Sequence, residues 1–160
     1  DALATSPDSQ AQTLKQHFAS GLASYDYVVI DCPPSLGALT RTALGASTDV
    51  IMPIQCEYFA MEGLTQMIEV IRDVMQRAPG RLGFAGILLT MYDESLELTR
   101  EVDEEVRDFF GEIVFETVIP RDVTLSEAPS HHLTGIDYAP RSRGTRAYIE
   151  LCMEVLGNDG

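Results

Sequence analysis

Positive charge is scarce in this sequence, and Lys15 is its only lysine. Lysine and arginine total 11 against 25 aspartates and glutamates, which gives a net charge of -14. Such a surface repels nucleic acid and anionic membranes unless its few cations cluster. It is also the composition of an ordinary solvated acidic surface that favours solubility. Binding to non-specific DNA is therefore possible, but we expect it to be weak.

Closely spaced cysteines and long apolar runs are absent as well. Cys32, Cys56 and Cys152 lie far apart and form no C-x-x-C pair, so neither a zinc site nor a redox dithiol is predicted. We expect three buried thiols in a reducing cytoplasm. The adjacent His131 and His132 are a poor metal chelate and are expected in a loop. No apolar run could span a bilayer, and no membrane association is expected.

Four apolar runs, rich in β-branched residues, are separated by amphipathic segments. The runs cover residues 27–31, 50–54, 84–90 and 115–120, and they lack the alternation of half-exposed strands. This pattern indicates strands of a parallel sheet that is covered on both faces. Helices are predicted over residues 14–22, 36–46, 60–77, 99–110 and 144–156. The predicted fold class is therefore α/β, with a mainly parallel sheet and helices on both faces.

The apolar spacing also predicts which helical side chains face the core. Within residues 99–110 they are Val102, Val106, Phe109 and Phe110, with acidic residues outward. The last helix offers Tyr148, Ile149, Cys152, Val155 and Leu156. The polar residues 1–12 indicate a loop or a frayed lead-in.

Polar residues follow the end of each predicted strand, in residues 31–35, 53–57, 90–93 and 120–122. Ligands of such sheets bind beyond the carboxyl ends of the strands, so these segments should face the same side. Asp31 ends an apolar strand, where a carboxylate is costly to bury unless it meets a cation or strong donors. It could hold a metal-bound water beside a phosphate chain, or it could cap the next helix, and both interpretations stay open.

Five segments occur in order within residues 14–156. They are YDYVVIDCPPSLG (25–37), PIQCEYFAMEGL (53–64), GILLTMYD (86–93), IPRDVTLSEAPS (119–130) and residues 138–148 with Ser142, Arg143 and Gly144. Together they resemble the ParA/Soj family of partitioning ATPases, which have a deviant Walker A phosphate loop. The first segment is similar to the Walker B segment of that family.

The resemblance implies an ATP-dependent dimer that switches between states and positions a chromosome, a plasmid or other cargo with a ParB-like partner. Its cofactors would be ATP and Mg²⁺ in the full-length protein, in the cytoplasm. By resemblance, Asp31 would bind magnesium through a metal-bound water, and Thr90, Pro120 and Asp122 would lie around the adenine. The switch loop would comprise Cys32, Pro33, Pro34 and Ser35, and Glu62 would lie near the dimer seam.

The sequence departs from this family in ways that affect function. It has no G-x-x-x-x-G-K-[ST] motif, so we expect a C-terminal portion that lacks the phosphate loop, contains no catalytic residue and is inactive alone. Ser95 and Thr124 replace family arginines that bind DNA, and Asp122 replaces an asparagine. The acidic C-terminal residues are unlike the membrane helix of the relative MinD.

The expected organisation is a lead-in over residues 1–13, a ParA-like ATPase domain over 14–157 and a tail over 158–160. A second interpretation stays open, in which a ParA-like fold serves only as a non-catalytic module for interaction or dimerisation. An upstream phosphate loop with its lysines would favour the switch ATPase over this module.

Overall fold

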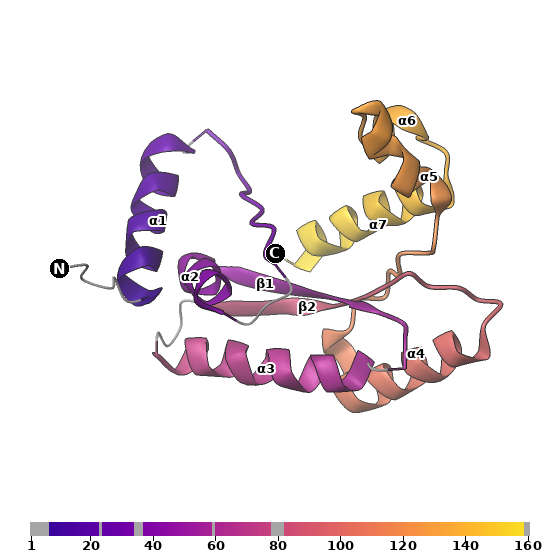
Figure 1. The fold of residues 1–160 in the computed structure, drawn as a ribbon, viewed down its shortest axis with the longest axis horizontal. Coiled ribbons are helices and arrows are strands. Elements are labelled where there is room, and N and C mark those ends of the chain that lie inside the picture. Colours follow the sequence, from indigo (N-terminus) through magenta and orange to yellow (C-terminus); the bar gives the residue numbers. More distant parts are fainter. Residues whose placement is uncertain (1–6, 23, 34–36, 59, 78–81, 159–160) are drawn as a thin grey trace. The chain divides into compact units, whose positions relative to one another are not determined.

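Helices alternate with two strands over residues 38–110, and the described elements before and after this stretch are all helical (Figure 1). The computed structural model describes residues 7–22, 24–33, 37–58, 60–77 and 82–158. The elements are α1 (Pro7–Gly21), α2 (Ala38–Ala46), β1 (Asp49–Gln55), α3 (Ala60–Arg77), β2 (Gly83–Thr90), α4 (Glu97–Phe110), η1 (Gly111–Ile113), α5 (Val123–Glu127), η2 (Ala128–His131), α6 (Gly135–Tyr138) and α7 (Arg143–Asn158). They confirm the predicted α/β class. The chain divides into two compact units, Asp1–Val50 with Thr65–Phe84 and Ile51–Leu64 with Ala85–Gly160.

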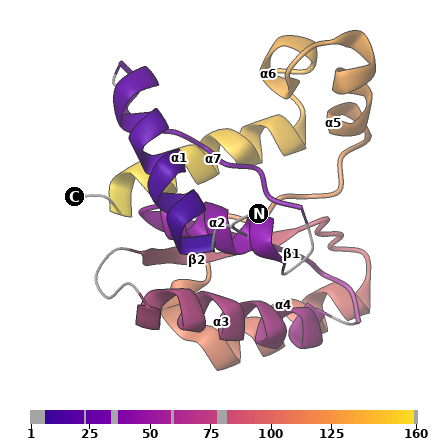
Figure 2. The same cartoon turned by 60° about the vertical axis from the view of Figure 1, so that its left-hand side comes forward.

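In the first unit, α1 packs against α2 (Figure 2). Ala11 of α1 is buried, and a Cβ added at Gly45 of α2 would lie 3.0 Å from its methyl carbon. The glycine therefore lets the two helices approach closely. The Thr42 hydroxyl also donates to the Gln10 amide oxygen at 3.2 Å.

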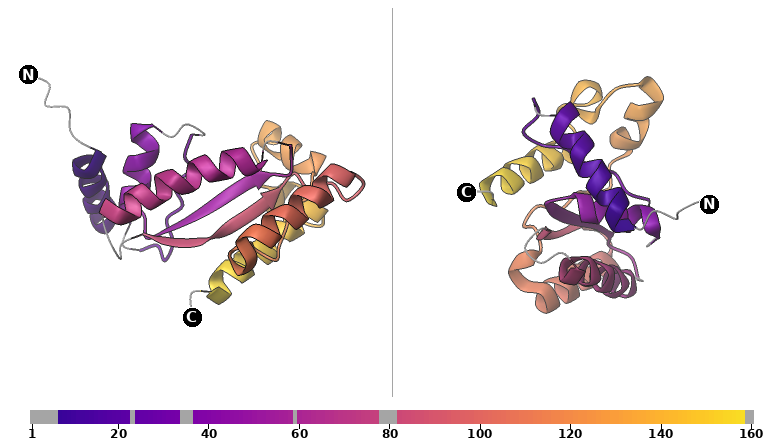
Figure 3. Two further views of the ribbon diagram at one scale, coloured as in Figure 1. Left: turned by 90° about the horizontal axis from the view of Figure 1, so that it is seen from below. Right: turned by 90° about the vertical axis from the view of Figure 1, so that its left-hand side faces the viewer.

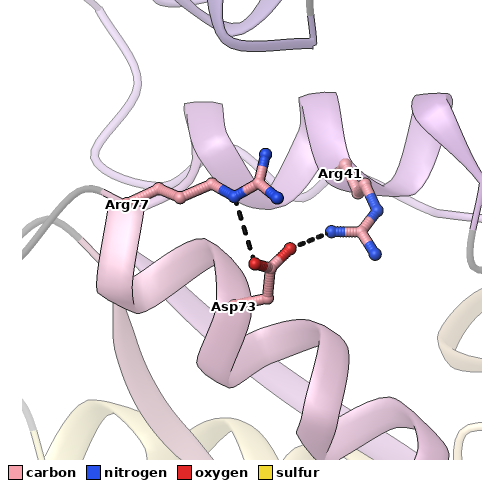
Figure 4. Close-up of polar contacts among 3 residues, drawn as sticks. All are labelled: Arg41, Asp73 and Arg77. Carbon is pink, nitrogen blue, oxygen red and sulfur yellow. Dashed lines mark hydrogen bonds and ion pairs between the residues drawn. The ribbon is translucent and has the colours of Figure 1, made fainter.

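A carboxylate with two arginines connects α2 to α3 in the same unit. Asp73 accepts hydrogen bonds from Arg41 of α2 and from the Nε of Arg77 of α3, the latter at 3.1 Å (Figure 4). The hydrogen bond from Arg41 lowers the pKa of Asp73 most, and Arg77 adds to this effect. Because all three side chains are partly exposed, the contact orients the helices more than it stabilises them.

The second unit contains the carboxyl-terminal parts of the paired strands β1 and β2 and an extended segment beside β2. Parallel bridges join Ile87 to Val114 and Tyr92 to Pro120. Phe115 donates its N–H to Ile87 O at 2.9 Å, and Ile119 donates to Leu89 O at 2.9 Å. The two hydrogen bonds are two residues apart on β2 but four residues apart on the segment, so the segment contains a bulge. The strand predicted over 115–120 is therefore not formed as a regular strand, and only isolated bridges at Val114 and Pro120 pair this segment.

Glu154 of α7 accepts hydrogen bonds from backbone N–H groups of the bulge, which are not paired with β2. Its two carboxylate oxygens accept the N–H groups of Glu116 at 2.7 Å and Thr117 at 3.0 Å. Partial burial opposes ionisation of Glu154, but the hydrogen bonds from Thr117 and Glu116 outweigh it and lower the pKa. A carboxylate thus replaces the strand carbonyls that these donors would otherwise need.

Helices cover both faces of the strands in this unit. Leu88 points to the α7 face and packs with Phe115, Ile119, Ala147 and Leu151. Alternation turns Ile87 and Leu89, both fully buried, to the opposite face, where α4 lies (Figures 1 and 3). Val102 and Val106 of α4 are buried as predicted.

Two further predictions of secondary structure are wrong. Residues 27–33 form no regular strand, and Val29 is 93% exposed. An apolar run becomes a strand only where a neighbouring strand binds its backbone, and the sheet of the described residues pairs β1 with β2 alone. The irregular lead-in expected over 1–12 is wrong for residues 7–12, because α1 begins at Pro7. Proline favours the first turn of a helix.

Several predicted environments also differ. Cys56 is buried, but Cys32 and Cys152 are exposed. Phe109 is 74% exposed although its spacing predicted the core. The buried apolar side chains of α7 are Ala147 and Leu151, and Thr145 is buried as well, whereas Tyr148, Ile149, Cys152 and Leu156 are exposed. The loop expected at His131 and His132 is partly helical, because η2 extends to His131. No helix of the described residues has the length and apolarity needed to cross a membrane.

We predict that Glu154→Gln lowers the free energy of unfolding by about 1–3 kcal/mol, the cost of weakening a charged hydrogen bond to partly buried donors. Urea unfolding at pH 7 measures it. The exposed Glu150 of the same helix provides the control, because Glu150→Gln removes the same charge at a site away from the bulge. Equal effects of the two substitutions would contradict a specific role for Glu154.

Candidate functional site

The ends of the extended segments in the second unit lie together, as the sequence predicted for residues 90–93 and 120–122. Thr90 ends β2, where its hydroxyl donates to Ile54 O at 3.0 Å and its carbonyl accepts from Cys56 N at 3.1 Å. Tyr92 pairs in parallel with Pro120. Two of the residues expected around adenine, Thr90 and Pro120, are thus placed on adjacent segments.

The backbone is strained at Met91, between Thr90 and Tyr92. Met91 has a φ of 53°, a left-handed conformation that non-glycine residues rarely adopt. Its neighbours hold it in place, because Tyr92 donates its N–H to Ile119 O at 3.0 Å and accepts from Arg121 N at 2.9 Å. Strained residues of this kind concentrate at functional sites.

A polar network fixes the side chain of Tyr92. Its hydroxyl donates to Asp103 Oδ2 of α4 at 3.1 Å, and Arg107 Nε donates to the other oxygen at 2.6 Å. Burial, followed by the hydrogen bond to Asp103, raises the pKa of Tyr92. Burial also raises the pKa of nearby Cys56 to about 11, so this thiol stays protonated and unreactive at neutral pH.

Asp122, the third residue expected around adenine, uses both carboxylate oxygens within the protein. Oδ1 accepts from the N–H of Thr124 at 2.9 Å and from its hydroxyl at 2.7 Å, which caps α5. Oδ2 accepts from Gly144 N, in the first turn of α7, at 2.8 Å. The hydrogen bonds from Thr124 and Gly144 lower the pKa of Asp122 to about 2.

Gly144 is necessary for this contact. A Cβ at that position would lie 2.9 Å from the Cβ of Asp122 and would also collide with Leu125. The first turn of α7 therefore reaches the carboxylate only without a side chain at residue 144. Ser142 completes the turn by accepting from Thr145 N at 3.1 Å.

Asp93 forms a second capped turn at the same end of the strands. Its Oδ1 accepts from the Ser95 hydroxyl at 2.6 Å and from Ser95 N at 3.0 Å. These hydrogen bonds lower the pKa of Asp93, and the charges of Arg121 and Arg143 add to the effect. Ser95, which stands where the resemblance expects arginine, thus has a local structural role.

The residues expected for magnesium and the switch belong to the first unit or fall outside the described residues. Asp31, Cys32 and Pro33 are exposed in the first unit, while Pro34 and Ser35 fall outside the described residues. Partial burial and the charge of Asp31 raise the pKa of Cys32, which disfavours a nucleophilic thiolate. Glu62, expected near a dimer seam, is exposed in the first turn of α3 within the second unit.

The described residues contain no group of three or more histidine, cysteine or acidic side chains that could hold a metal. An exposed single carboxylate such as Asp31 nevertheless fits a water-mediated role, because Mg²⁺ keeps several waters and is bound by few protein groups with substrate phosphates.

Ser142 and Gly144 belong to the segment 138–148 that carries the resemblance, but no role in the site was predicted for them. Neither Asp103 nor Arg107 was predicted to shape the site. The Asp122-x-Thr124 spacing is a signal for a helix cap. The bond from Asp122 to Gly144 spans 22 residues, and no local pattern predicts it.

Comparison with known proteins agrees with the resemblance. The family model for the AAA domain matches residues 2–83. The sporulation initiation inhibitor protein Soj of Bacillus subtilis is 48% identical over 150 residues, which cover 94% of this chain. The chromosome-partitioning ATPase Soj of Treponema pallidum is 45% identical over 92% of this chain. This chain belongs to the ParA/Soj family of AAA domain proteins.

As a member of the ParA/Soj family, the chain spans 59% and 58% of the length of these two relatives. Among solved structures, cobyrinic acid a,c-diamide synthase from Mycobacterium smegmatis with bound ATP analog and magnesium is 37% identical, with a TM-score of 0.71. The match covers 88% of this chain and 51% of that protein.

We predict that Asp122→Asn lowers stability at pH 7 by roughly 1 kcal/mol, because the amide oxygen can still cap α5 while the amide nitrogen cannot accept the hydrogen bond from Gly144 N. The native pKa of about 2 lies below the ordinary value of 3.8, so this contribution is complete above about pH 5. It is lost as the pH falls from about 4 to 2, and the difference between the two proteins should shrink over that range. Urea unfolding at several pH values tests this, with Asp26→Asn, an exposed aspartate, as the control.

Proposed function

We propose that this chain is the C-terminal portion of a ParA/Soj-type ATPase that acts as an ATP-dependent dimerisation switch. The switch would position a chromosome, a plasmid or other cargo with a ParB-like partner. The observation that carries the proposal is the junction of Thr90, Pro120 and Asp122 beyond the strand ends, in a chain 48% identical to a Soj protein.

The residues present fit the adenine and magnesium sides of a nucleotide site. Met91, in its left-handed conformation, and Asp122, which caps α5, hold the backbone around the proposed base position in one conformation. ATP with Mg²⁺ would supply the transferable phosphoryl group and the charge that stabilises it. Both carboxylate oxygens of Asp122 already accept hydrogen bonds from Thr124 and Gly144. We therefore propose that Asp122 shapes the site and that neighbouring backbone groups contact the base.

Asp31 is proposed to hold a magnesium-bound water, and residues 32–35 would move with the state of the nucleotide. The exposure of Asp31 leaves its carboxylate open to solvent, as an outer-shell ligand requires. A phosphate-binding loop is not encoded in these residues, so the 160-residue chain should not hydrolyse ATP by itself.

The experiment compares phosphate release by this chain and by the product of the same reading frame extended upstream, each with ATP and magnesium. We expect turnover only in the extended protein. Asp31→Ala should reduce it by roughly 10–100-fold, the usual effect of losing an outer-shell metal partner. Asp26→Ala, five residues away and also exposed, should leave it nearly unchanged.

Light scattering with and without ATP tests the switch, and Glu62→Lys should weaken the ATP-dependent dimer. An extended protein that dimerises but shows no turnover sensitive to Asp31 would instead support the non-catalytic module. Turnover by the 160-residue chain that is abolished by Asp31→Ala would disprove the need for an upstream phosphate loop.

A further inference from the structure

Just beyond the end of β2, the chain contains one residue more than the adjacent segment pairs with. Ile119 donates its N–H to Leu89 O at 2.9 Å. Arg121 donates its N–H to Tyr92 O, also at 2.9 Å. The two acceptors are three residues apart on the β2 side, but the two donors are only two residues apart on the adjacent segment. Because regular parallel pairing advances equally on both strands, Met91 is an extra residue, and we call this feature the Met91 bulge.

The extra residue keeps its backbone polar groups outside the pairing. Tyr92, and not Met91, donates its N–H to Ile119 O at 3.0 Å. Among the described residues, neither the N–H nor the C=O of Met91 has a hydrogen-bond partner. The left-handed φ of 53° at Met91 is costly for a residue other than glycine and persists only where the surrounding structure imposes it. Contacts outside Met91 itself must therefore stabilise the bulge.

The side chain of Tyr92 supplies such a contact. Ile87 and Leu89 point to the face that α4 covers, so a regular strand would place residue 91 on this face and residue 92 on the opposite one. In the structure, Tyr92 lies on the α4 side instead, where its hydroxyl donates to Asp103 Oδ2 at 3.1 Å. In the regular register, Tyr92 would point toward the α7 face and lose this hydrogen bond.

The acceptor of this hydrogen bond is itself held in position. Arg107, one turn further along α4, donates its Nε to Asp103 Oδ1 at 2.6 Å. The side chain of Asp103 is only 20% exposed, and a hydrogen bond to a charged, partly buried acceptor is stronger than one between neutral groups in water. The contact between Tyr92, Asp103 and Arg107, which we call the α4 tether, therefore favours the bulged register over the regular one.

The Met91 bulge leaves one donor and one acceptor beside Thr90 and Pro120, where the proposed function places the base of the nucleotide. Adenine carries an N6–H donor next to the N1 acceptor, whereas guanine carries the O6 acceptor next to an N1–H donor. Proteins read a single base through hydrogen bonds to this edge. A donor and an acceptor held in a fixed order distinguish the two bases, because the wrong base opposes donor to donor and acceptor to acceptor.

We propose that Tyr92 and Asp103 are positioning residues that hold the Met91 bulge and thereby give the nucleotide site its preference for adenine over guanine. This inference rests on the proposed function. Tyr92 acts through the backbone of Met91 and does not itself contact the base. Without the α4 tether, the chain relaxes to the regular register, in which the N–H of Met91 donates to Ile119 O and is no longer available to a ligand.

Amide hydrogen exchange, followed by NMR, tests the register in the 160-residue chain without nucleotide. The Tyr92 amide should exchange roughly 10-fold more slowly than the Met91 amide, because only the former is hydrogen-bonded. Tyr92→Phe and Asp103→Leu should transfer this protection to the Met91 amide. Asp103→Asn keeps an oxygen that accepts from the hydroxyl and should retain the original pattern. The matched control is Tyr138→Phe, which removes an exposed hydroxyl that donates to Glu127 Oε2 at 3.2 Å.

Dissociation constants for ATP and GTP, each with magnesium, test base selection in the protein extended upstream. The unsubstituted protein should bind ATP at least about 10-fold more tightly than GTP, which corresponds to about one hydrogen bond. Tyr92→Phe and Asp103→Leu should bring this ratio close to unity, whereas Asp103→Asn and Tyr138→Phe should leave it nearly unchanged. A merely structural role of Tyr92 would weaken the binding of both nucleotides equally and would not alter the ratio.

The outcomes separate this inference from the proposed function. Circular dichroism verifies that each variant folds, and the two substitutions that remove the α4 tether should agree. Protection that stays on the Tyr92 amide in Tyr92→Phe, or an unchanged ratio of ATP to GTP binding, would overturn the inference and leave the ATPase proposal intact. Equal binding of ATP and GTP by the unsubstituted extended protein would do the same. An extended protein that binds neither nucleotide would contradict the proposed function itself, and the inference about the base with it.

Discussion

The carboxylate of Asp122 determines the arrangement of the second unit beyond the strand ends. One oxygen caps α5 and the other binds the first turn of α7, so a single side chain fixes the start of two helices. α7 in turn supplies Glu154, which binds the bulged segment beside β2, and Leu151, which packs on Leu88. The edge of the sheet and the helix that covers it therefore depend on the same local contact.

Helix α4 faces two environments with opposite electrostatic character. On the strand side, Asp103 is neutralised by Arg107 and binds the hydroxyl of Tyr92, next to the strained Met91 turn. On the outer side, carboxylates such as Glu104 have no such partners among the described residues.

The residues of the proposed nucleotide site differ in how firmly hydrogen bonds hold their backbone. Thr90 and Pro120 are fixed by backbone pairing between adjacent extended segments. Asp31 lies in the first unit on an exposed segment without regular secondary structure. The segment around Asp31 therefore has less support from backbone pairing than Thr90 and Pro120, and segments with few packing contacts change conformation most readily.

The sequence by itself determined the α/β class, the strands around residues 50–54 and 84–90, and the helices over 60–77 and 99–110. Their hydrophobic periodicity is local and survives in any packing. Only the tertiary structure decided that Val29 is exposed, that Phe109 lies in a groove and that Asp122 reaches Gly144. A strand requires a neighbour to bind its backbone, and the burial of a side chain requires an element to cover it. Both conditions depend on contacts between residues far apart in the chain, which no local pattern encodes.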